Sequence, residues 1–125
     1  MSVPRLVLVR GLPGSGKSTY AKSLSIHHVE ADMYFVNQHG TYQFNPKKLR
    51  HAHRWCQGQT EHLLKKGRDV VVSNTFIELW EMDPYLEMAT QFNVDVEVVV
   101  CGGNFTSIHD VPKSTIKKMK FKWQD

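Results

Sequence analysis

The chain has 125 residues, 41% of them hydrophobic and 22% charged, and it carries a formal net charge of +4. This composition is typical of one globular domain over residues 1–125, and it excludes a disordered chain and, with only two cysteines, a disulfide-rich one. The apolar runs are too short to cross a membrane, and the first residues lack the anatomy of a signal peptide. We therefore expect a cytoplasmic protein with no membrane attachment and no stable protein partner. The modest positive charge permits an anionic ligand without proving one.

A glycine-rich segment follows the first predicted strand. Residues 6–9 form an unbroken apolar run typical of a buried strand, and residues 18–24 show helical spacing of apolar side chains. Between them, Gly11–Ser18 fits the phosphate-binding pattern G-x-x-x-x-G-K-[ST] at every fixed position. The alternative is a chance glycine turn before a helix, but strand, loop and helix come in the order that phosphate binding requires. The sequence therefore predicts a nucleoside triphosphate site.

Each part of this segment has an expected role. The glycines let backbone N–H groups converge on phosphate oxygens, Lys17 reaches the β- and γ-phosphates, and the Ser18 hydroxyl ligates Mg²⁺. The cofactors predicted are ATP and Mg²⁺. The residues expected to bind the nucleotide are Gly11, Pro13, Gly14, Ser15, Gly16, Lys17, Ser18 and Thr19.

The remaining elements alternate between strands and helices. A strand over 26–32 ends in an acid, residues 33–45 form a loop or short lid, and a long helix over 46–66 begins at Pro46 and ends before Gly67. There follow a strand over 69–73, a helical stretch over 78–92 that restarts at 83–84, a strand over 94–101, a turn at 102–103, a connection through 104–112 and a helix from about 113. The apolar stripe expected on the long helix consists of Leu49, Ala52, His53, Cys56, Thr60, Leu63 and Leu64.

This alternation predicts an α/β fold of the P-loop NTPase type. We expect a three-layer sandwich with a short, about four-stranded parallel sheet and helices on both faces. Ligands of such folds bind at the carboxyl ends of the strands. The glycine segment, Asp32 and Ser73-Asn74-Thr75 all follow predicted strand ends, so we expect them to meet there.

A triphosphate site serves a transferase only if it also holds an acceptor. Phosphoryl transfer usually needs a carboxylate that takes the proton of the acceptor hydroxyl, and Asp32 is our candidate for that base, with Lys17 stabilising the transferred charge. The alternative for Asp32 is a carboxylate that only caps a strand end. Many such proteins carry an aspartate after the third strand to hold Mg²⁺ through water, but Ser73-Asn74-Thr75 contains none. Either Asp32 shares the metal's shell through water, or Ser73 and Asn74 do, or these polar residues only satisfy the backbone.

Other polar side chains have both a functional and a structural interpretation. Arg50 and Arg54 can contact DNA phosphates or form a solvated helix face, and the lysines within 113–122 can hold a polyanion or keep an amphipathic helix wet. Three histidines on the long helix, at 51, 53 and 62, lack the four-residue spacing of a helical metal pair, so we expect no metal there.

Several motifs recur in an order that resembles a known family. They are Gly11 to Thr19, Glu30-Ala31-Asp32, Ala52-His53 with Cys56, Ser73-Asn74-Thr75, Trp80-Glu81-Met82 with Pro84-Tyr85, and His109-Asp110-Val111-Pro112 with Met119. Together they resemble the small P-loop kinase family that includes phage polynucleotide kinase and phage DNA-base kinases. The resemblance implies ATP- and Mg²⁺-dependent phosphorylation of a hydroxyl on DNA, with the position of Asp32 matching the catalytic aspartate. If a phage encodes the chain, the location is the host cytoplasm.

The chain departs from the polynucleotide kinase pattern at its arginines. Phe35 stands where that enzyme has an arginine that grips the phosphate of the terminal nucleotide, and no arginine follows Arg68, so the usual lid arginines are missing. Lys113, Lys117 or Lys118 can replace them only as point charges. Related short phage enzymes phosphorylate 5-hydroxymethyluracil within DNA, and an extruded base needs aromatic faces. The aromatic residues that follow Asp32 are Tyr34, Phe35, Tyr42 and Phe44, which form either such a pocket or a small core under a loop.

The favoured hypothesis is therefore a kinase that acts on hydroxymethyluracil in DNA. The alternatives are a 5′-hydroxyl polynucleotide kinase, a nucleotide-binding ATPase-like protein without kinase activity, and a kinase of a free nucleoside or metabolite. The residues expected to contact the substrate are Tyr34, Phe35, Arg50, Arg54, Asn74 and Thr75.

Overall fold

A computed structural model describes residues 3–102 and 113–125 of the chain. The second glycine of the expected turn, Gly103, and the connection 104–112 with the motif His109–Pro112 lie outside the described residues. Among the described residues, we find no helix with the length and apolar character that crossing a membrane requires.

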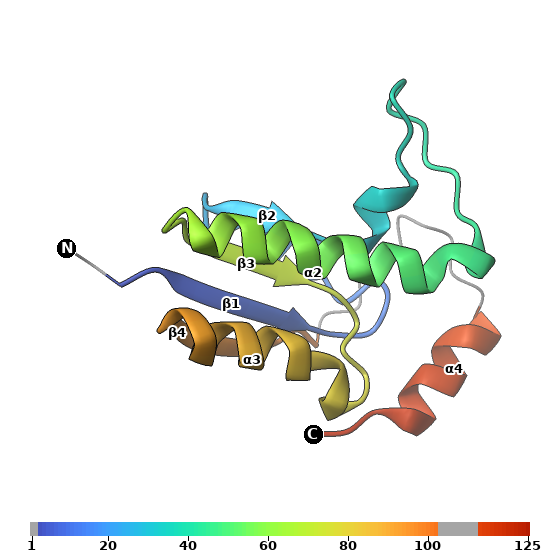
Figure 1. Cartoon of the computed structure of the whole chain (residues 1–125). Helices are drawn as coiled ribbons and strands as arrows, with labels where there is room; N and C mark the ends of the chain where they lie inside the picture. The colour runs from blue at the N-terminus through green and yellow to red at the C-terminus, as the bar shows by residue number, and fades with distance from the viewer. Residues whose placement is uncertain (1–2, 103–112) are drawn as a thin grey trace.

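A four-stranded parallel sheet forms the centre of the structure (Figure 1). Its strands are β1 (Arg5–Arg10), β2 (His27–Val29), β3 (Val70–Ser73) and β4 (Asp95–Val100), arranged in the order β2-β3-β1-β4. The central strands β1 and β3 are buried almost throughout, as their unbroken apolar runs predict. Because all four strands run in the same direction, the segments that follow them gather at one end of the sheet.

Helices cover both faces of this sheet. The α1 helix (Lys17–Ser23) packs through Ala21 on the face that presents Val7 and Val71. The other face, which presents Leu6 and Leu8, carries α2 (Leu49–Lys65) and α3 (Asp83–Phe92). A further helix, α4 (Lys113–Lys122), lies beyond the end of the sheet to which β1 points (Figure 1). The predicted three-layer α/β fold is therefore confirmed.

Three short 3-10 helices connect these elements, and one of them corrects the expected second strand. They are η1 (Ala31–Phe35), η2 (Pro46–Lys48) and η3 (Leu79–Met82). The strand predicted over 26–32 stops at Val29, so Asp32 lies in η1 rather than at a strand end. The chain turns there because the Ala31 N–H leaves the ladder and donates to the Asn74 side-chain oxygen at 3.0 Å.

The apolar stripe predicted for the long helix is correct for four of its members. Ala52, Cys56, Thr60 and Leu64 are buried against the sheet at the expected helical spacing. Leu63 is partly buried against the core, whereas Leu49 and His53 are exposed. The stripe prediction was wrong for these two residues, because the helix turns both positions away from the buried face.

The C-terminal residues pack back against the end of β1. The Arg10 side chain, only 3% exposed, donates to the carbonyl oxygens of Phe76, Ile77 and Gln124, and its guanidinium lies 4.4 Å from the centre of the Trp123 ring. Burial lowers the pKa of Arg10, and the nearby acids Asp125 and Glu81 oppose that change. The residue directly before the glycine segment is thus fixed in place by the end of the chain.

Candidate active site

The glycine segment forms a tight loop between β1 and α1. Gly14 and Gly16 have φ angles of 80° and 91°, in the left-handed region that side chains other than glycine rarely adopt. At Gly11 a Cβ atom would lie 2.3 Å from the Ser15 hydroxyl oxygen and 2.8 Å from the Cys101 carbonyl oxygen. The N–H of Gly11 also donates to the Thr75 carbonyl at 3.2 Å, which ties the loop to the end of β3. Sequence and backbone conformation therefore agree on a phosphate-binding loop.

The residues of this loop fit a bound nucleotide. The Ser15 hydroxyl is buried and has no hydrogen-bond partner within the described part of the chain, which is costly unless a ligand satisfies it. The Lys17 ammonium donates to the Leu12 carbonyl at 3.2 Å, so it folds back over the loop that would hold the phosphates. When bound, Mg²⁺ would neutralise phosphate charge there, with the Ser18 hydroxyl as its protein ligand. The described residues contain no group of three or more His, Cys, Asp or Glu side chains that could hold a metal.

Two carboxylates act on the Lys17 ammonium. Burial lowers the pKa of Lys17, and the negative charges of Glu30 and Asp32, followed by that of Cys101, oppose the change. Burial in turn raises the pKa of the Cys101 thiol, and the charge of Lys17 lowers it. The segments that follow β1 and β2 therefore bring a cation and two anions together around the loop, and the Cys101 thiol, after β4, lies near the cation.

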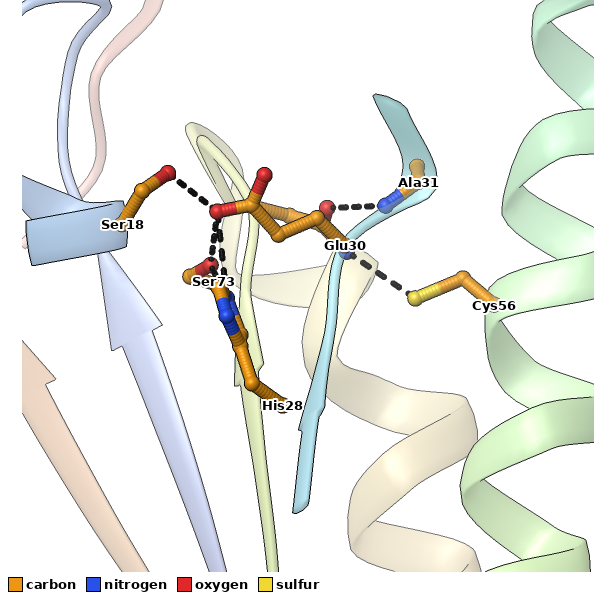
Figure 2. A network of polar contacts seen from close by, with 7 residues as sticks. Ser18, His28, Glu30, Ala31, Cys56 and Ser73 are labelled. Atoms are coloured by element: carbon orange, nitrogen blue, oxygen red, sulfur yellow. Dashed lines mark hydrogen bonds and ion pairs between the residues drawn. The ribbon is translucent and has the colours of Figure 1, made fainter. Parts of the chain in front are cut away.

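Glu30 is the centre of a buried polar network (Figure 2). One oxygen, Oε1, accepts hydrogen bonds from the Ser18 hydroxyl of α1 and, at 2.6 Å, from the Ser73 hydroxyl of β3. The same oxygen lies 3.1 Å from His28 Nε2, which is also 2.7 Å from the Ser73 hydroxyl oxygen. Burial raises the pKa of Glu30, but the hydrogen bonds from His28, Ser18 and Ser73 and the charge of His28 outweigh it and lower this pKa to about 2. Glu30 is therefore ionised at neutral pH.

Asp32 lies two residues further along, on η1. Its Oδ1 accepts a hydrogen bond from the Tyr42 hydroxyl at 3.2 Å. Burial, together with the charge and the hydrogen bond of Asp32, raises the pKa of Tyr42 to about 12, so this tyrosine stays a donor at neutral pH. Asp32 is partly buried and, unlike Glu30, forms no hydrogen bond with Ser18 among the contacts of the described residues. The two carboxylates thus have different neighbours.

Asn74 and Thr75, which we expect to contact substrate, also help to build the site. The Asn74 side chain is buried, accepts the Ala31 N–H, and donates to the Cys56 sulfur at 3.6 Å. Thr75 accepts the Gly11 N–H through its backbone carbonyl. Asn74 therefore fixes the turn that carries Glu30 and Asp32, and Thr75 fixes the start of the glycine loop.

The aromatic residues after Asp32 form a small core under the loop. Phe35, 7% exposed, has its ring centre 5.1 Å from that of Phe44 and 6.3 Å from that of Tyr42, both in edge contacts. Tyr34 stacks on Trp55 of α2 with ring centres 6.2 Å apart. The buried Phe35 ring cannot stack on a base in this conformation. Phe44, in contrast, is 49% exposed at the edge of the cluster.

The two arginines of the long helix differ in their distance from the loop end of the sheet. Both Arg50 and Arg54 are exposed. The first turn of α2 lies at the end of the sheet to which the strands point, and the helix then runs back along the sheet (Figure 1). Arg50 is therefore closer than Arg54 to the end where ligands of parallel α/β folds bind.

Comparison with known proteins places this loop in a family. A family model described as AAA domain matches residues 6–103. The chain belongs to the AAA domain family. This AAA domain is 37% identical over 98 residues to human NEDD4-binding protein 2, an alignment that covers 73% of the chain but only 5% of that protein. It is 28% identical over 90 residues to a protein of Acanthamoeba polyphaga mimivirus named as a bifunctional polynucleotide phosphatase/kinase, covering 72% of the chain and 18% of that protein.

A solved structure supports the same fold. A chain of the Pnkp1/Rnl/Hen1 RNA repair complex superposes with a TM-score of 0.73 at 22% identity, over 98% of this chain and 44% of that one. At this identity the likeness shows the fold alone, and the AAA domain spans only a small part of the relatives named above. Within these limits, the chain is a P-loop kinase-like nucleotide-binding domain related to polynucleotide kinases.

Glu30 and His28 are the site residues to which the sequence analysis assigned no role, although Glu30 belongs to the motif Glu30-Ala31-Asp32. A signal for Glu30 was present, because it is an acid next to the end of a strand in a chain whose third strand lacks one. The contact with Ser18 could not be deduced without knowing that β2 pairs with β3. For His28, whose partner is Ser73 on the neighbouring strand, no local pattern gave a signal.

Proposed function

We propose that this domain is an ATP- and Mg²⁺-dependent kinase that transfers the γ-phosphate to a hydroxyl on nucleic acid. The observation that carries the proposal is the pair of carboxylates near Lys17, one bound to Ser18 and the other held by Tyr42. A protein that only binds nucleotide needs no second carboxylate. A transferase does, because a base must receive the proton of the acceptor.

In this mechanism the acceptor oxygen attacks the γ-phosphorus while its proton passes to the Asp32 carboxylate. The bond between the γ-phosphorus and the bridging oxygen breaks, and ADP leaves with that electron pair. Lys17 stabilises the negative charge of the phosphates, and the glycine loop excludes water from them. The Tyr42 hydroxyl orients Asp32 through its hydrogen bond.

A polynucleotide 5′-hydroxyl is the acceptor that the relatives favour. The mimivirus relative is named as a polynucleotide phosphatase/kinase, and the superposed structure belongs to an RNA repair complex. Because Phe35 stands at the expected arginine position, the charge that holds the terminal nucleotide must come from elsewhere. Lys117 and Lys118 are exposed on α4 at the same end of the sheet and supply two such charges.

A hydroxymethyl group on an extruded DNA base is the second candidate acceptor. The observation in its favour is the exposed Phe44 ring, stacked on Tyr42 with ring centres 6.4 Å apart, because Tyr42 also contacts Asp32. A base that stacks on Phe44 would bring its substituent to the side of the loop that carries Asp32.

A transfer assay with γ-labelled ATP separates these functions. Four acceptors are compared: a 5′-hydroxyl oligonucleotide, a 5′-phosphorylated duplex with hydroxymethyluracil, the same duplex with thymine, and a free nucleoside. Label on the first alone identifies a polynucleotide end kinase, and label on the second but not the third identifies a base kinase. Label only on the nucleoside, or nucleotide binding without transfer to any acceptor, contradicts a nucleic-acid kinase.

The variant Asp32→Asn tests the assigned base. We expect turnover to fall at least about a hundred-fold while ATP affinity stays within a few-fold, because the amide keeps the shape but takes no proton. The matched control is Asp95→Asn, which removes an exposed carboxylate at the start of β4, the opposite end of the sheet. If Asp32→Asn instead loses ATP binding and turns over normally at saturating ATP, then Asp32 serves the metal and not the acceptor.

A further inference from the structure

The end of β3 lacks the acid that usually accompanies a P-loop, and the neighbouring strand supplies one. Strand pairing aligns His28 with Val71 and Val29 with Val72, so the next position along β2, Glu30, stands beside Ser73. Their side chains meet, since the Ser73 hydroxyl donates to Glu30 Oε1 at 2.6 Å. The carboxylate is therefore present in the structure, but one strand away from its expected place.

We propose that Glu30 performs the task of the missing third-strand acid and orients the Mg²⁺ of bound ATP through Ser18. This inference rests on the proposed nucleotide site and deepens it. Ser18 is the residue whose hydroxyl ligates the metal in a P-loop, and that hydroxyl donates its proton to Glu30 Oε1. A hydroxyl that gives its proton to a carboxylate turns its lone pairs away from that carboxylate, and these lone pairs are what a cation binds.

The hydrogen-bond network also fixes the direction of every donor around Glu30. Ser73 has one hydroxyl proton and gives it to Glu30, so His28 Nε2, at 2.7 Å from the Ser73 oxygen, must be the donor in that contact. The two serine hydroxyls both donate to Oε1, and His28 Nε2 lies 3.1 Å from the same oxygen (Figure 2). The carboxylate group is thus held in one orientation, with Oε1 facing Ser18, before any metal binds.

Asp32 does not fit this role as well. It is located on η1, past the turn that Asn74 fixes, and its Oδ1 accepts the Tyr42 hydroxyl from the loop. From this position Asp32 can instead serve as the general base that takes the proton of the acceptor hydroxyl. The site therefore assigns separate roles to two acids only two residues apart, Glu30 for the metal and Asp32 for the acceptor.

The test measures how nucleotide affinity depends on Mg²⁺, without any turnover. A fluorescent non-hydrolysable ATP analogue is titrated into the whole chain at a series of Mg²⁺ concentrations and also with EDTA. For Glu30→Gln we expect affinity in EDTA within about twofold of wild type, but at least a tenfold higher Mg²⁺ concentration for half-maximal strengthening, which is typical of losing a partner that orients a metal ligand. The control Glu87→Gln, an exposed acid on α3, should match the wild type.

A transplanted acid provides the second arm of the test. In the double variant Glu30→Ser with Ser73→Asp, one carboxylate returns to β3 among the same neighbours. We expect the Mg²⁺ concentration for half-maximal strengthening of nucleotide binding to stay within about threefold of wild type. If Glu30→Gln does not fold, the inference is tested with this double variant alone. An unchanged Mg²⁺ dependence in folded Glu30→Gln overturns the inference, as does a tenfold loss in the folded double variant.

The outcomes also separate this inference from the proposed function. If the wild type binds no nucleotide, both are wrong. If Glu30→Gln shows the expected loss but no acceptor is labelled, the metal role of Glu30 stands and the kinase proposal fails. If acceptors are labelled and Glu30→Gln binds Mg²⁺ and nucleotide like wild type, the kinase proposal stands and this inference fails.

Discussion

Replacing Glu30 with glutamine should change how the stability of the folded protein depends on pH. The side chain is 13% exposed and accepts hydrogen bonds at Oε1 from Ser18 and Ser73, with His28 within ion-pair distance. Glutamine keeps the shape and an acceptor oxygen but has no charge to titrate. The difference between the pH dependence of the free energy of unfolding of wild type and that of the variant is therefore the contribution of the Glu30 carboxylate.

The size and sign of that part follow from the two pKa values of the carboxyl group. Burial raises the pKa of folded Glu30, but the hydrogen bonds and the charge of His28 lower it from the ordinary 4.5 to about 2. Since each pKa unit corresponds to about 1.4 kcal/mol, the ionised form stabilises the fold by about 3 kcal/mol. This stabilisation is complete above pH 4.5 and is lost as the pH falls through about 2, with roughly 2 kcal/mol gone by pH 3.

Urea unfolding at a series of pH values between 3 and 7 measures this effect. We expect the free energy of unfolding of wild type, minus that of Glu30→Gln, to shrink by about 2 kcal/mol from pH 7 to pH 3. The exposed control Glu87→Gln should run parallel to wild type over the whole range. If the Glu30→Gln curve is also parallel to wild type, the carboxylate is not held by its network as described, and the reasoning is refuted.

Three further substitutions test the loop and its support. Lys17→Ala should abolish phosphate transfer in the labelling assay while the melting temperature stays near that of wild type, because Lys17 stabilises charge and not the core; wild-type turnover would refute its role. Gly11→Ala should weaken ATP binding at least about tenfold by calorimetry, since the new Cβ would lie 2.3 Å from the Ser15 hydroxyl oxygen; unchanged affinity would show that the loop can move aside. Arg10→Met should lower the free energy of unfolding by about 2–4 kcal/mol in urea, because it leaves buried carbonyl groups without their donor and removes the contact with Trp123; a loss below about 0.5 kcal/mol would contradict that account.

The fold was predictable because its signals are local. The glycine spacing, the apolar strands and Gly67 after the end of the long helix each depend on a few neighbouring residues. Pro46 marks the start of the 3-10 helix η2, and α2 itself begins three residues later than predicted, at Leu49. The end of β2 was not predictable in this way. The buried side-chain amide of Asn74, the residue directly after β3, accepts the Ala31 N–H where β2 ends, and that contact joins residues 43 positions apart.

Only those residues of the candidate site that belong to a recognisable local motif could be predicted from the sequence. The nucleotide loop and Asp32 stand out from their own surroundings, whereas Glu30 gains its meaning from Ser18 and Ser73 on two other elements. The aromatic residues show the same limit. Their spacing is compatible with a base pocket or a small core, and the burial of Phe35 against Tyr42 and Phe44 is a tertiary property.

The geometry of parallel sheets explains how a metal-orienting acid can move from one strand to the next. Neighbouring strands lie about 4.8 Å apart, and glutamate extends one methylene further than aspartate, so Glu30, directly after β2, recovers part of that distance toward Ser18. A large side chain on β3 would block its path, but Ser73 is small and gives its hydroxyl proton to the arriving carboxylate. The two positions are therefore coupled: Glu30 without Ser73 loses a donor, and an acid at both would place like charges side by side. It follows that Ser73→Asp alone should weaken the site, and that only the paired exchange should preserve it.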